Sequence, residues 1–247
     1  MLRRRAVRHA IILAAGNGDR FQSPTHESKL LQPLLGRPIL VRTLEAARDA
    51  GVKSVTLVLG YQAERLRALA AHATPVGLTA DFAFNPEWRL ENGVSALAAR
   101  SHVNGEPFAL LMGDHVFDPA VLRRMLRTEL GPDESLLAVD SRSSAPEVIA
   151  EATKVRREGS RIVAIGKDIP SFDALDTGVF ICTRPLFDAL DAARRDGDTT
   201  LSGGIRRLAA RRLMRAFDIG EARWCDIDTT SDLADAESVL SAAPGAA

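Results

Sequence analysis

Cysteine, histidine and aromatic residues are all scarce in this 247-residue sequence. Its two cysteines, Cys182 and Cys225, lie inside apolar segments, which favours buried thiols in a reducing compartment over a disulfide framework. The five histidines do not cluster with cysteine, so the sequence carries no zinc-site signature. We therefore expect a cytoplasmic protein that uses neither disulfides nor zinc.

Net charge and long hydrophobic runs are missing as well. The 32 lysines and arginines balance 32 aspartates and glutamates, so no overall field attracts nucleic acid or an anionic membrane. No apolar run approaches the roughly 18 residues that a membrane span requires. The arginine-rich residues 1–9 predict a solvated basic arm rather than a targeting segment, because the apolar stretch after them ends at Gly16. We expect no nucleic-acid partner and no membrane insertion.

What the sequence does contain is an alternation of strand-like and helix-like segments. This order predicts a parallel sheet with helices on both faces, and hairpin-like segments in the second half make the sheet mixed. The predicted class is α/β, with a mixed, mainly parallel sheet flanked by helices. No linker divides the chain, so we expect one domain over 1–240, with halves 1–130 and 131–240 and a frayed tail over 241–247. The strand-like segments of the first half are 9–13, 54–59, 79–84 and 108–112.

Helix ends are marked by single residues. Pro38 predicts the start of a helix that ends at Gly51, and Asp118 with Pro119 predicts the start of another.

The first strand leads into a small-residue loop, Ala14-Ala15-Gly16-Asn17-Gly18-Asp19-Arg20, and Lys29 follows. Glycines allow positive φ and a close approach to backbone N–H groups, which form an anion-binding nest. The Walker pattern is absent, and a dinucleotide fingerprint would need a small residue in place of Phe21. The loop therefore predicts a nucleoside-triphosphate cradle with Arg20 and Lys29 as its cations, the alternative being an ordinary βα turn.

Carboxylates follow two other predicted strands. Asp114 comes after the strand 108–112, where open α/β sheets bind ligands, and it could hold Mg²⁺ against phosphate oxygens or serve only in a turn. Alternation along a strand places Trp224, Asp226 and Asp228 on one face. We assign the metal to Asp114 and Asp228, because Asp228 lies nearer the strand end; Asp226 could cap the following helix.

Polar residues elsewhere permit two interpretations each. Asn92, Gly93 and Ser95 could contact a nucleotide base or begin a helix. If Glu158-Gly159 is a two-residue turn, Lys154 pairs with Val163, and Lys154 and Lys167 project to one side about 13 Å apart along the strand. That spacing suits a phosphate-bearing acceptor, although lone lysines usually cover a solvated face.

Taken together, these motifs resemble the sugar-phosphate nucleotidyltransferases, and among them most closely the CTP:inositol-1-phosphate cytidylyltransferases. The resemblance runs from Ala10 to about Leu240, and one departure is Lys29-Leu30 where lysine-proline is usual. The motifs that carry it are L-A-A-G-x-G-x-R-F, N-x-x-W…E-N-G-x-S, G-D-H, A-T-K-V, I-G-K-D, D-T-G-V-F and W-x-D-I-D-T.

The resemblance implies a Rossmann-like sheet of the nucleotide-diphospho-sugar transferase type, with a nucleotide-binding and an acceptor-binding half. It implies CTP and Mg²⁺ as partners and a CDP-alcohol and pyrophosphate as products. In bifunctional relatives a membrane phosphotransferase domain follows; here we expect a separate protein to use the product. The oligomeric state stays open, a homodimer included. By motif position, nucleotide contacts fall on Leu13, Ala14, Ala15, Gly16, Gly18, Asn92, Gly93 and Ser95, catalysis on Arg20 and Lys29, metal on Asp114 and Asp228, and acceptor contacts on Lys154, Lys167, Asp176 and Thr177.

The implied reaction is attack by an acceptor phosphate oxygen on the α-phosphorus of CTP. A phosphate monoester has its second pKa at about 6, so it needs no general base at neutral pH. Other acceptors are phosphocholine, an aminoalkylphosphonate or a sugar 1-phosphate. Rival functions are a molybdenum-cofactor guanylyltransferase, a nucleotide-sugar glycosyltransferase and a non-catalytic nucleotide-binding regulator.

Overall fold

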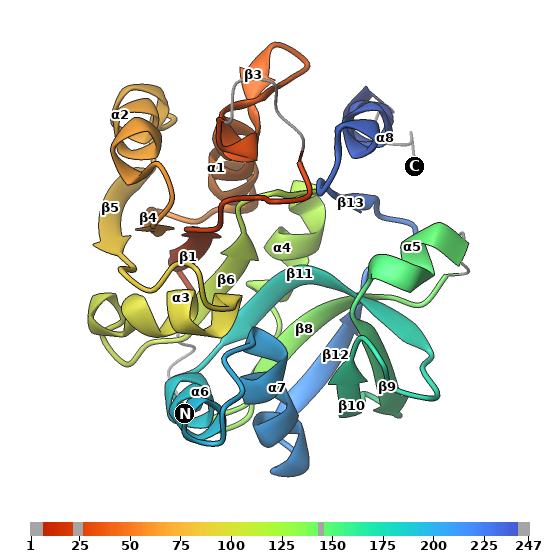
Figure 1. Ribbon diagram of the computed structural model, residues 1–247. Helices are drawn as coiled ribbons and strands as arrows, with labels where there is room; N and C mark the ends of the chain where they lie inside the picture. Colours follow the sequence, from red (N-terminus) through yellow and green to blue (C-terminus); the bar gives the residue numbers. More distant parts are fainter. Residues whose placement is uncertain (1–6, 22–26, 143–145, 242–247) are drawn as a thin grey trace.

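A computed structural model describes residues 7–21, 27–142 and 146–241. Its centre is a nine-stranded mixed sheet in the order β5-β4-β1-β6-β11-β8-β12-β10-β9 (Figure 1). Neighbours among β5, β4, β1 and β6 are parallel, and β11 runs antiparallel to both β6 and β8. The strands are β1 (His9–Ala14), β4 (Ser54–Leu59), β5 (Thr79–Phe84), β6 (Phe108–Met112), β8 (Ser135–Asp140), β9 (Lys154–Glu158), β10 (Arg161–Gly166), β11 (Ala174–Cys182) and β12 (Met214–Asp218).

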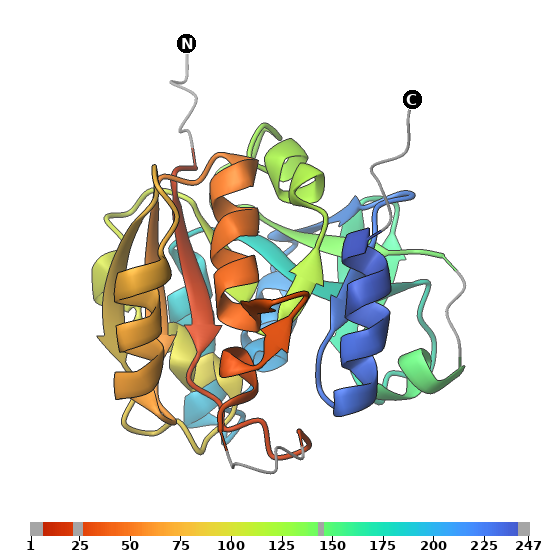
Figure 2. The same cartoon turned by 90° about the horizontal axis from the view of Figure 1, so that it is seen from above.

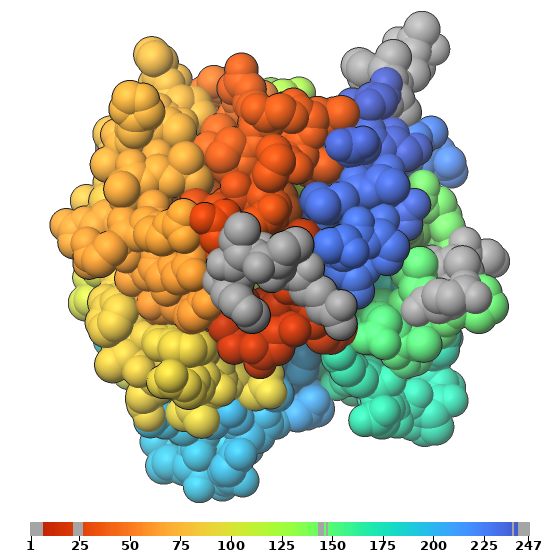
Figure 3. All heavy atoms as spheres, turned by 45° about the horizontal axis from the view of Figure 1, so that its top comes forward, coloured from red at the N-terminus to blue at the C-terminus, as the bar shows by residue number. Residues whose placement is uncertain are grey.

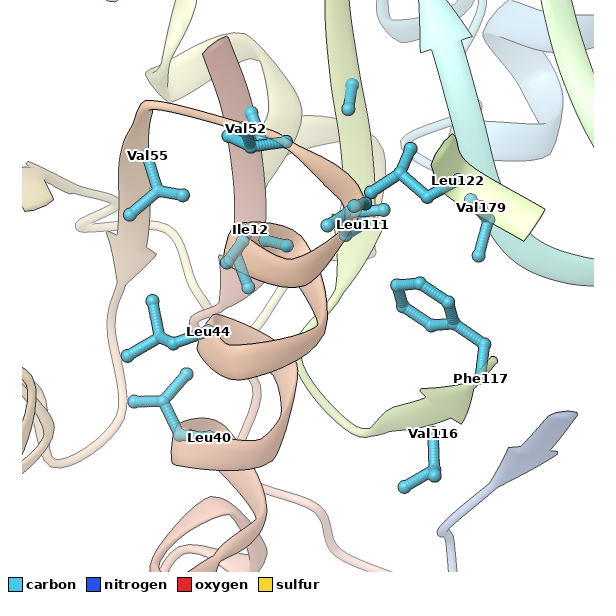
Figure 4. Close-up of a cluster of buried hydrophobic side chains, with 14 of the residues drawn as sticks. Ile12, Leu40, Leu44, Val52, Val55, Leu111, Val116, Phe117, Leu122 and Val179 are labelled. Carbon is cyan, nitrogen blue, oxygen red and sulfur yellow. The ribbon is translucent and has the colours of Figure 1, made fainter. Parts of the chain in front are cut away.

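Helices cover both faces of this sheet, and each face has its own hydrophobic cluster. Alternation along β1 explains the division, because Ile12 packs into one cluster and Ile11 into the other. Figure 4 shows the first cluster around Ile12, Leu40 and Leu44, and Figure 2 shows α2, α1 and α8 side by side over it. One face carries α1 (Ile39–Ala50), α2 (Ala63–Ala73), α4 (Pro119–Met125) and α8 (Thr230–Ser241); the other carries α3 (Asn92–Ala98), α6 (Pro185–Arg195) and α7 (Leu201–Ala210).

Local capping explains where several helices begin and end. Helix α1 begins directly after Pro38 and ends at Gly51, which takes the left-handed conformation with φ 113°. The Asp118 carboxylate accepts a hydrogen bond from the Ala120 N–H at 2.8 Å, with Pro119 at the first helical position of α4. Both starts and the C-cap predicted from the sequence are confirmed.

The predicted pairing of the second-half hairpin is wrong. Strands β9 and β10 join through Gly159 and Ser160, one residue later than expected, because Gly159 is the residue that adopts the left-handed turn conformation, with φ 60°. A bulge between Ile162 and Ala164 adds a further shift, so Lys154 pairs with Gly166 instead of Val163. Strand β9 also pairs with the start of β11, which closes a ring of pairings through β11, β8, β12, β10 and β9.

Several short elements escaped sequence analysis because they are too short to show a period. They include β7 (His115–Phe117), which pairs with β13 (Trp224–Asp226) in a separate two-stranded sheet. Strand β13 itself was expected, since the sequence places Trp224 and Asp226 on one face of a strand. The others are the 3₁₀ helices η1 (Lys29–Leu31) and η2 (Arg100–His102), the strand pair β2 (Pro33–Leu34) and β3 (Arg37–Pro38), and α5 (Pro146–Glu151).

Membrane insertion finds no support among the helices of the described ranges, since none combines the length and apolar character needed to cross a bilayer. Residues 1–6 of the predicted basic arm and 242–247 of the predicted tail lie outside the described residues.

Candidate active site

The glycine loop after β1 lies at the carboxyl edge of the sheet, held by its neighbours. The Leu13 carbonyl accepts from the Gly113 N–H at 2.9 Å, and the Ala15 carbonyl accepts from the Tyr61 N–H at 2.9 Å. Gly18 has φ 65°, and a Cβ there would lie 3.1 Å from Cδ of Lys29. Glycine at this position therefore lets the loop close over the lysine stem.

Gly16 differs from Gly18. A Cβ added to it would meet no atom of the described residues within 4 Å, and its φ lies outside the left-handed region. Contacts within the described chain therefore do not explain glycine at this position.

Lys29 is the centre of the charged cluster. Its Nζ lies 2.7 Å from Oδ2 of Asp114 and 2.9 Å from Oδ1 of Asp228, and it donates to the Ile227 carbonyl at 2.8 Å. The side chain is only 9% exposed. Burial alone would lower the pKa of Lys29, but the charges of Asp114 and Asp228 outweigh it and raise that pKa. The ammonium stays charged at neutral pH.

Arg20 extends this cluster to Glu151 in α5. Its Nη2 lies 2.5 Å from Oδ2 of Asp228, and its Nη1 lies 2.8 Å from Oε2 of Glu151 in α5. In Figure 3 the blue α8 lies between the red N-terminal segment and the green α5. The structure thus brings Arg20, Lys29, Asp114 and Asp228 into one continuous network.

Asp114, His115 and Asp226 form a second, adjacent group. One donor atom from each lies within 4.8 Å of the others: Nε2 of His115 is 3.3 Å from Oδ1 of Asp226 and 3.9 Å from Oδ1 of Asp114. Oδ1 of Asp226 is buried and, apart from this ion pair with His115, has no hydrogen-bond partner in the described part of the chain. Two carboxylates and an imidazole are a donor set that fits a divalent cation, and an orphaned carboxylate oxygen is a reason for one to bind.

Asp228 is placed differently from the sequence expectation. Strand β13 ends at Asp226, so the alternation that put Asp226 and Asp228 on one face does not continue that far. Both oxygens of Asp228 contact the cations Lys29 and Arg20, while its N–H donates to Asp232.

His115 was missed by sequence reasoning, although its position directly after Asp114 was a signal. Strand pairing sets it opposite Asp226, and its Nδ1 lies 2.9 Å from the Thr177 carbonyl. A Cβ on Gly178, which has φ 74°, would lie 2.3 Å from that nitrogen. Burial alone would lower the pKa of His115, but Asp226 and Asp114 raise it to about 10.

The α3 residues that are predicted to contact the nucleotide make contacts with other parts of the chain. Oδ1 of Asn92 accepts from the Leu201 N–H at 2.8 Å. A Cβ on Gly93 would lie 2.6 Å from the Thr199 carbonyl oxygen. The buried Ser95 hydroxyl accepts from the Asn85 amide at 3.0 Å. These contacts join α3 to the start of α7 and to the end of β5.

The predicted acceptor residues do not form the expected array. Lys154 pairs with Gly166 and donates to the Lys167 backbone carbonyl at 2.7 Å, so Lys154 and Lys167 are not offset by about 13 Å along the strand as expected. The buried Thr177 hydroxyl donates to the Ala138 carbonyl at 2.9 Å. Asp176 accepts from the Gly178 N–H at 2.8 Å, and burial raises its pKa to about 6.

A cavity of about 340 Å³ lies at the carboxyl end of β8. Trp224 links the wall of this cavity to the Asp114-His115-Asp226 group. Its Nε1 donates to Oδ2 of Asp140 at 2.9 Å, and its ring stacks on His115 with centroids 6.2 Å apart. The lining residues are Asp140, Ser141, Arg142, Ile149, Phe172, Asp173, Ala174 and Leu175.

Comparison with known proteins identifies similar chains. Residues 10–215 match the MobA-like NTP transferase domain. A "Bifunctional IPC transferase and DIPP synthase" of Rubrobacter xylanophilus is 35% identical over 94% of this chain and 51% of its own length, and the protein of that name in Aquifex aeolicus is 31% identical over 95% and 52%. The chain thus spans about half the length of these relatives. A "CMP-5'-(3-aminopropyl)phosphonate synthase" of Streptomyces rubellomurinus is 30% identical over 90% of this chain and 37% of its own length.

Solved structures agree with the fold. The inositol-1-phosphate CTP transferase from T. maritima has a TM-score of 0.82 at 26% identity, covering 98% of this chain and 99% of that one. A UDP-glucose pyrophosphorylase complexed with UDP-glucose has a TM-score of 0.77 at 19% identity, covering 95% and 98%. The fold class predicted from the sequence is confirmed.

Proposed function

Because this chain belongs to the MobA-like NTP transferase domain family, we propose that it is a cytidylyltransferase, which joins CTP to a phosphorylated alcohol and releases pyrophosphate. One observation carries the proposal: Arg20, Lys29 and the acids form a single cluster directly beside the glycine loop. Inositol 1-phosphate is the proposed acceptor, because a similar structure and two relatives carry inositol-phosphate names. An aminoalkylphosphonate is the second candidate, from the synthase relative.

Charge repulsion is the main barrier to this reaction. A triphosphate with about four negative charges meets a dianionic phosphate, so catalysis consists of positioning and neutralisation. The backbone of Leu13, Ala14, Ala15, Gly16 and Gly18 would hold the triphosphate, with Arg20 and Lys29 as counter-charges. Since the acceptor phosphate is already dianionic, no side chain has to remove a proton.

The proposed divalent cation is Mg²⁺, and the donor geometry favours Asp114 and Asp226 as its ligands. When bound, such an ion would offset the phosphate charges that the two side-chain cations leave uncompensated. Asp228 holds Lys29 and Arg20 in place, and it becomes a metal ligand only if these side chains move.

The acceptor would lie in the cavity at the end of β8, next to Asp176. The carboxylates and the Arg142 guanidinium along its wall are groups that hydrogen-bond alcohol hydroxyls. Lys154, Lys167 and Thr177 remain predicted acceptor residues, and Asn92, Gly93 and Ser95 predicted nucleotide residues. A separate membrane phosphotransferase that uses the product, a homodimer and a cytoplasmic location also remain predictions.

A substrate matrix tests the function. The protein is incubated with each of CTP, UTP, GTP and ATP against inositol 1-phosphate, phosphocholine, aminoethylphosphonate and glucose 1-phosphate, and pyrophosphate release is measured. We expect activity with CTP and inositol 1-phosphate. Activity with GTP alone would favour the guanylyltransferase alternative. CTP binding by calorimetry without turnover in any combination would indicate a regulator.

A further inference from the structure

We infer that Nε2 of His115 is a third ligand of the divalent cation at Asp114 and Asp226. The inference rests on the proposed function only in that it concerns the cation proposed for this site. An oxygen-only site and a mixed nitrogen–oxygen site differ in which metals they prefer, so the assignment has a measurable consequence.

The three donor atoms are already close to ligand spacing. Ligands at about 2.0–2.2 Å from an octahedral ion lie about 3 Å apart when adjacent. Nε2 of His115 is 3.3 Å from Oδ1 of Asp226 and 3.9 Å from Oδ1 of Asp114. Since all three donor atoms lie within 4.8 Å of one another, side-chain rotation without a backbone rearrangement would bring them to ligand spacing.

The imidazole ring is oriented as a metal-binding histidine is. Nδ1 faces the Thr177 carbonyl at 2.9 Å, and a carbonyl oxygen can only accept, so Nδ1 carries a proton. Nε2 is then the nitrogen directed at both acids, and metal-binding histidines are commonly fixed by such a backbone acceptor. Without the cation Nε2 is protonated beside the two acids, so binding of the cation there would release that proton to solvent. Gly178 makes this contact possible, since any side chain there would occupy the position of the ring.

A purely positioning role for His115 explains less. A histidine that merely holds Asp226 would donate an aligned hydrogen bond to it, yet the 3.3 Å ion pair between Nε2 and Oδ1 of Asp226 lacks hydrogen-bond geometry. A shared cation would satisfy this oxygen and Nε2 together. Because imidazole suits transition metals better than Mg²⁺, we expect the chain to bind Mn²⁺ more tightly than Mg²⁺.

The test uses Mn²⁺ alone, without nucleotide or acceptor. Electron spin-echo spectroscopy of the bound ion detects a directly coordinated nitrogen. We expect this coupling in the wild-type protein and in the control His72→Ala, whose histidine lies on the exposed side of α2. His115→Ala should lose the coupling and bind Mn²⁺ at least about 10-fold more weakly, the loss that even outer-sphere partners produce.

Each outcome is informative. Bound Mn²⁺ without nitrogen coupling in the wild-type protein would overturn the role of His115 and leave a carboxylate site. No Mn²⁺ binding at all would overturn both the cation site and this inference. Mg²⁺ binding tighter than Mn²⁺ would also contradict it. Because turnover is not measured, a wrong choice of nucleotide or acceptor does not affect the result, and the wild-type spectrum decides even if His115→Ala does not fold.

Discussion

The position of the Lys29 ammonium group gives the acids of this site different contacts. Lys29 lies within 3 Å of an oxygen of both Asp114 and Asp228, so in this arrangement it occupies the space between them. Asp228 is further neutralised by Arg20, whereas Oδ1 of Asp226 accepts no hydrogen bond from a described residue. The carboxylates therefore differ in their contacts. Asp228 holds the cationic side chains of Lys29 and Arg20, Asp226 belongs to the group with His115, and Asp114 belongs to both groups.

Substituting each acid separately tests this division. We expect Asp226→Asn to weaken Mn²⁺ binding about 10-fold or more, because it removes a charged donor. Asp228→Asn should leave Mn²⁺ binding nearly unchanged but lower kcat about 10²-fold, because Lys29 and Arg20 lose their anchor. Calorimetry with Mn²⁺ and a pyrophosphate assay measure the two effects. If Asp228→Asn weakens the metal and Asp226→Asn does not, the ligand assignment from the sequence was the better one.

The two loop glycines provide a matched pair. Gly16→Ala should leave the melting temperature unchanged, since its Cβ would meet no described atom, and should weaken CTP binding about 10-fold if phosphate contacts the loop backbone. Gly18→Ala should destabilise the protein by about 1–2 kcal/mol, because alanine is strained at φ 65°. Thermal unfolding and CTP titration separate the effects. Unchanged CTP affinity in Gly16→Ala would argue for an ordinary turn.

At the scale of elements, short strands assemble the Asp114-His115-Asp226 group. Strand β7 is only three residues long, yet Val116 and Phe117 are buried in the hydrophobic cluster of Figure 4 and fix its path. Pairing with β13 then sets Asp226 opposite His115. A register shift in the middle of β11 places Gly178 under the histidine ring. Neither the pairing of β7 with β13 nor the register shift in β11 has a local sequence signature.

The junction of α3 and α7 allows a structural and a binding role to be distinguished. Asn92→Ala removes the acceptor of the Leu201 N–H and should lower the free energy of unfolding by about 1 kcal/mol, as for a lost helix cap. If Asn92 also contacts the base, CTP affinity falls as well. Chemical denaturation and CTP titration are the measurements. A stability loss with unchanged affinity would contradict the nucleotide role.

At the scale of the whole molecule, β11 joins the two halves, since it pairs with β6 on one side and β8 on the other. Asp140 reinforces the wall of the cavity at the end of β8. Its carboxylate accepts from Arg142 and from Nε1 of Trp224, and Arg142 also donates to the Ala222 carbonyl. The wall of the cavity is thereby connected to the segment that leads into the Asp114-His115-Asp226 group.

This network predicts sensitivity to acid. Burial alone would raise the pKa of Asp140, but hydrogen bonds from Arg142 and Trp224 outweigh it and lower that pKa. A lowered pKa in the folded state contributes stability above the unfolded value, about 3.9, that is lost as pH falls through the folded value. We expect Asp140→Asn to be less stable than wild type by about 1–3 kcal/mol at pH 7.

Below pH 4 the difference between wild type and Asp140→Asn should narrow. Urea unfolding at several pH values measures it. A difference that stays constant down to pH 2 would show that the charge of Asp140 is not responsible.

Much of the architecture could be predicted from the sequence. The segments 54–59, 79–84 and 108–112 are strands with the predicted bounds, because apolar runs and the alternation of apolar and polar residues are local signals. The family predicted from the ordered motifs is confirmed by the domain match over 10–215. The β9–β10 register was not predictable, since a bulge leaves the composition of a hairpin unchanged while shifting every pair beyond it.

By itself the sequence determined the properties that depend on neighbours along the chain: strand and helix periods, helix caps, and the glycine loop followed by its cations. Only the tertiary structure decided which acids share a centre, because Lys29, Asp114, His115 and Asp226 come from segments that meet through strand pairing and core packing. Contacts between distant segments depend on three-dimensional distance, and spacing along the chain does not encode it.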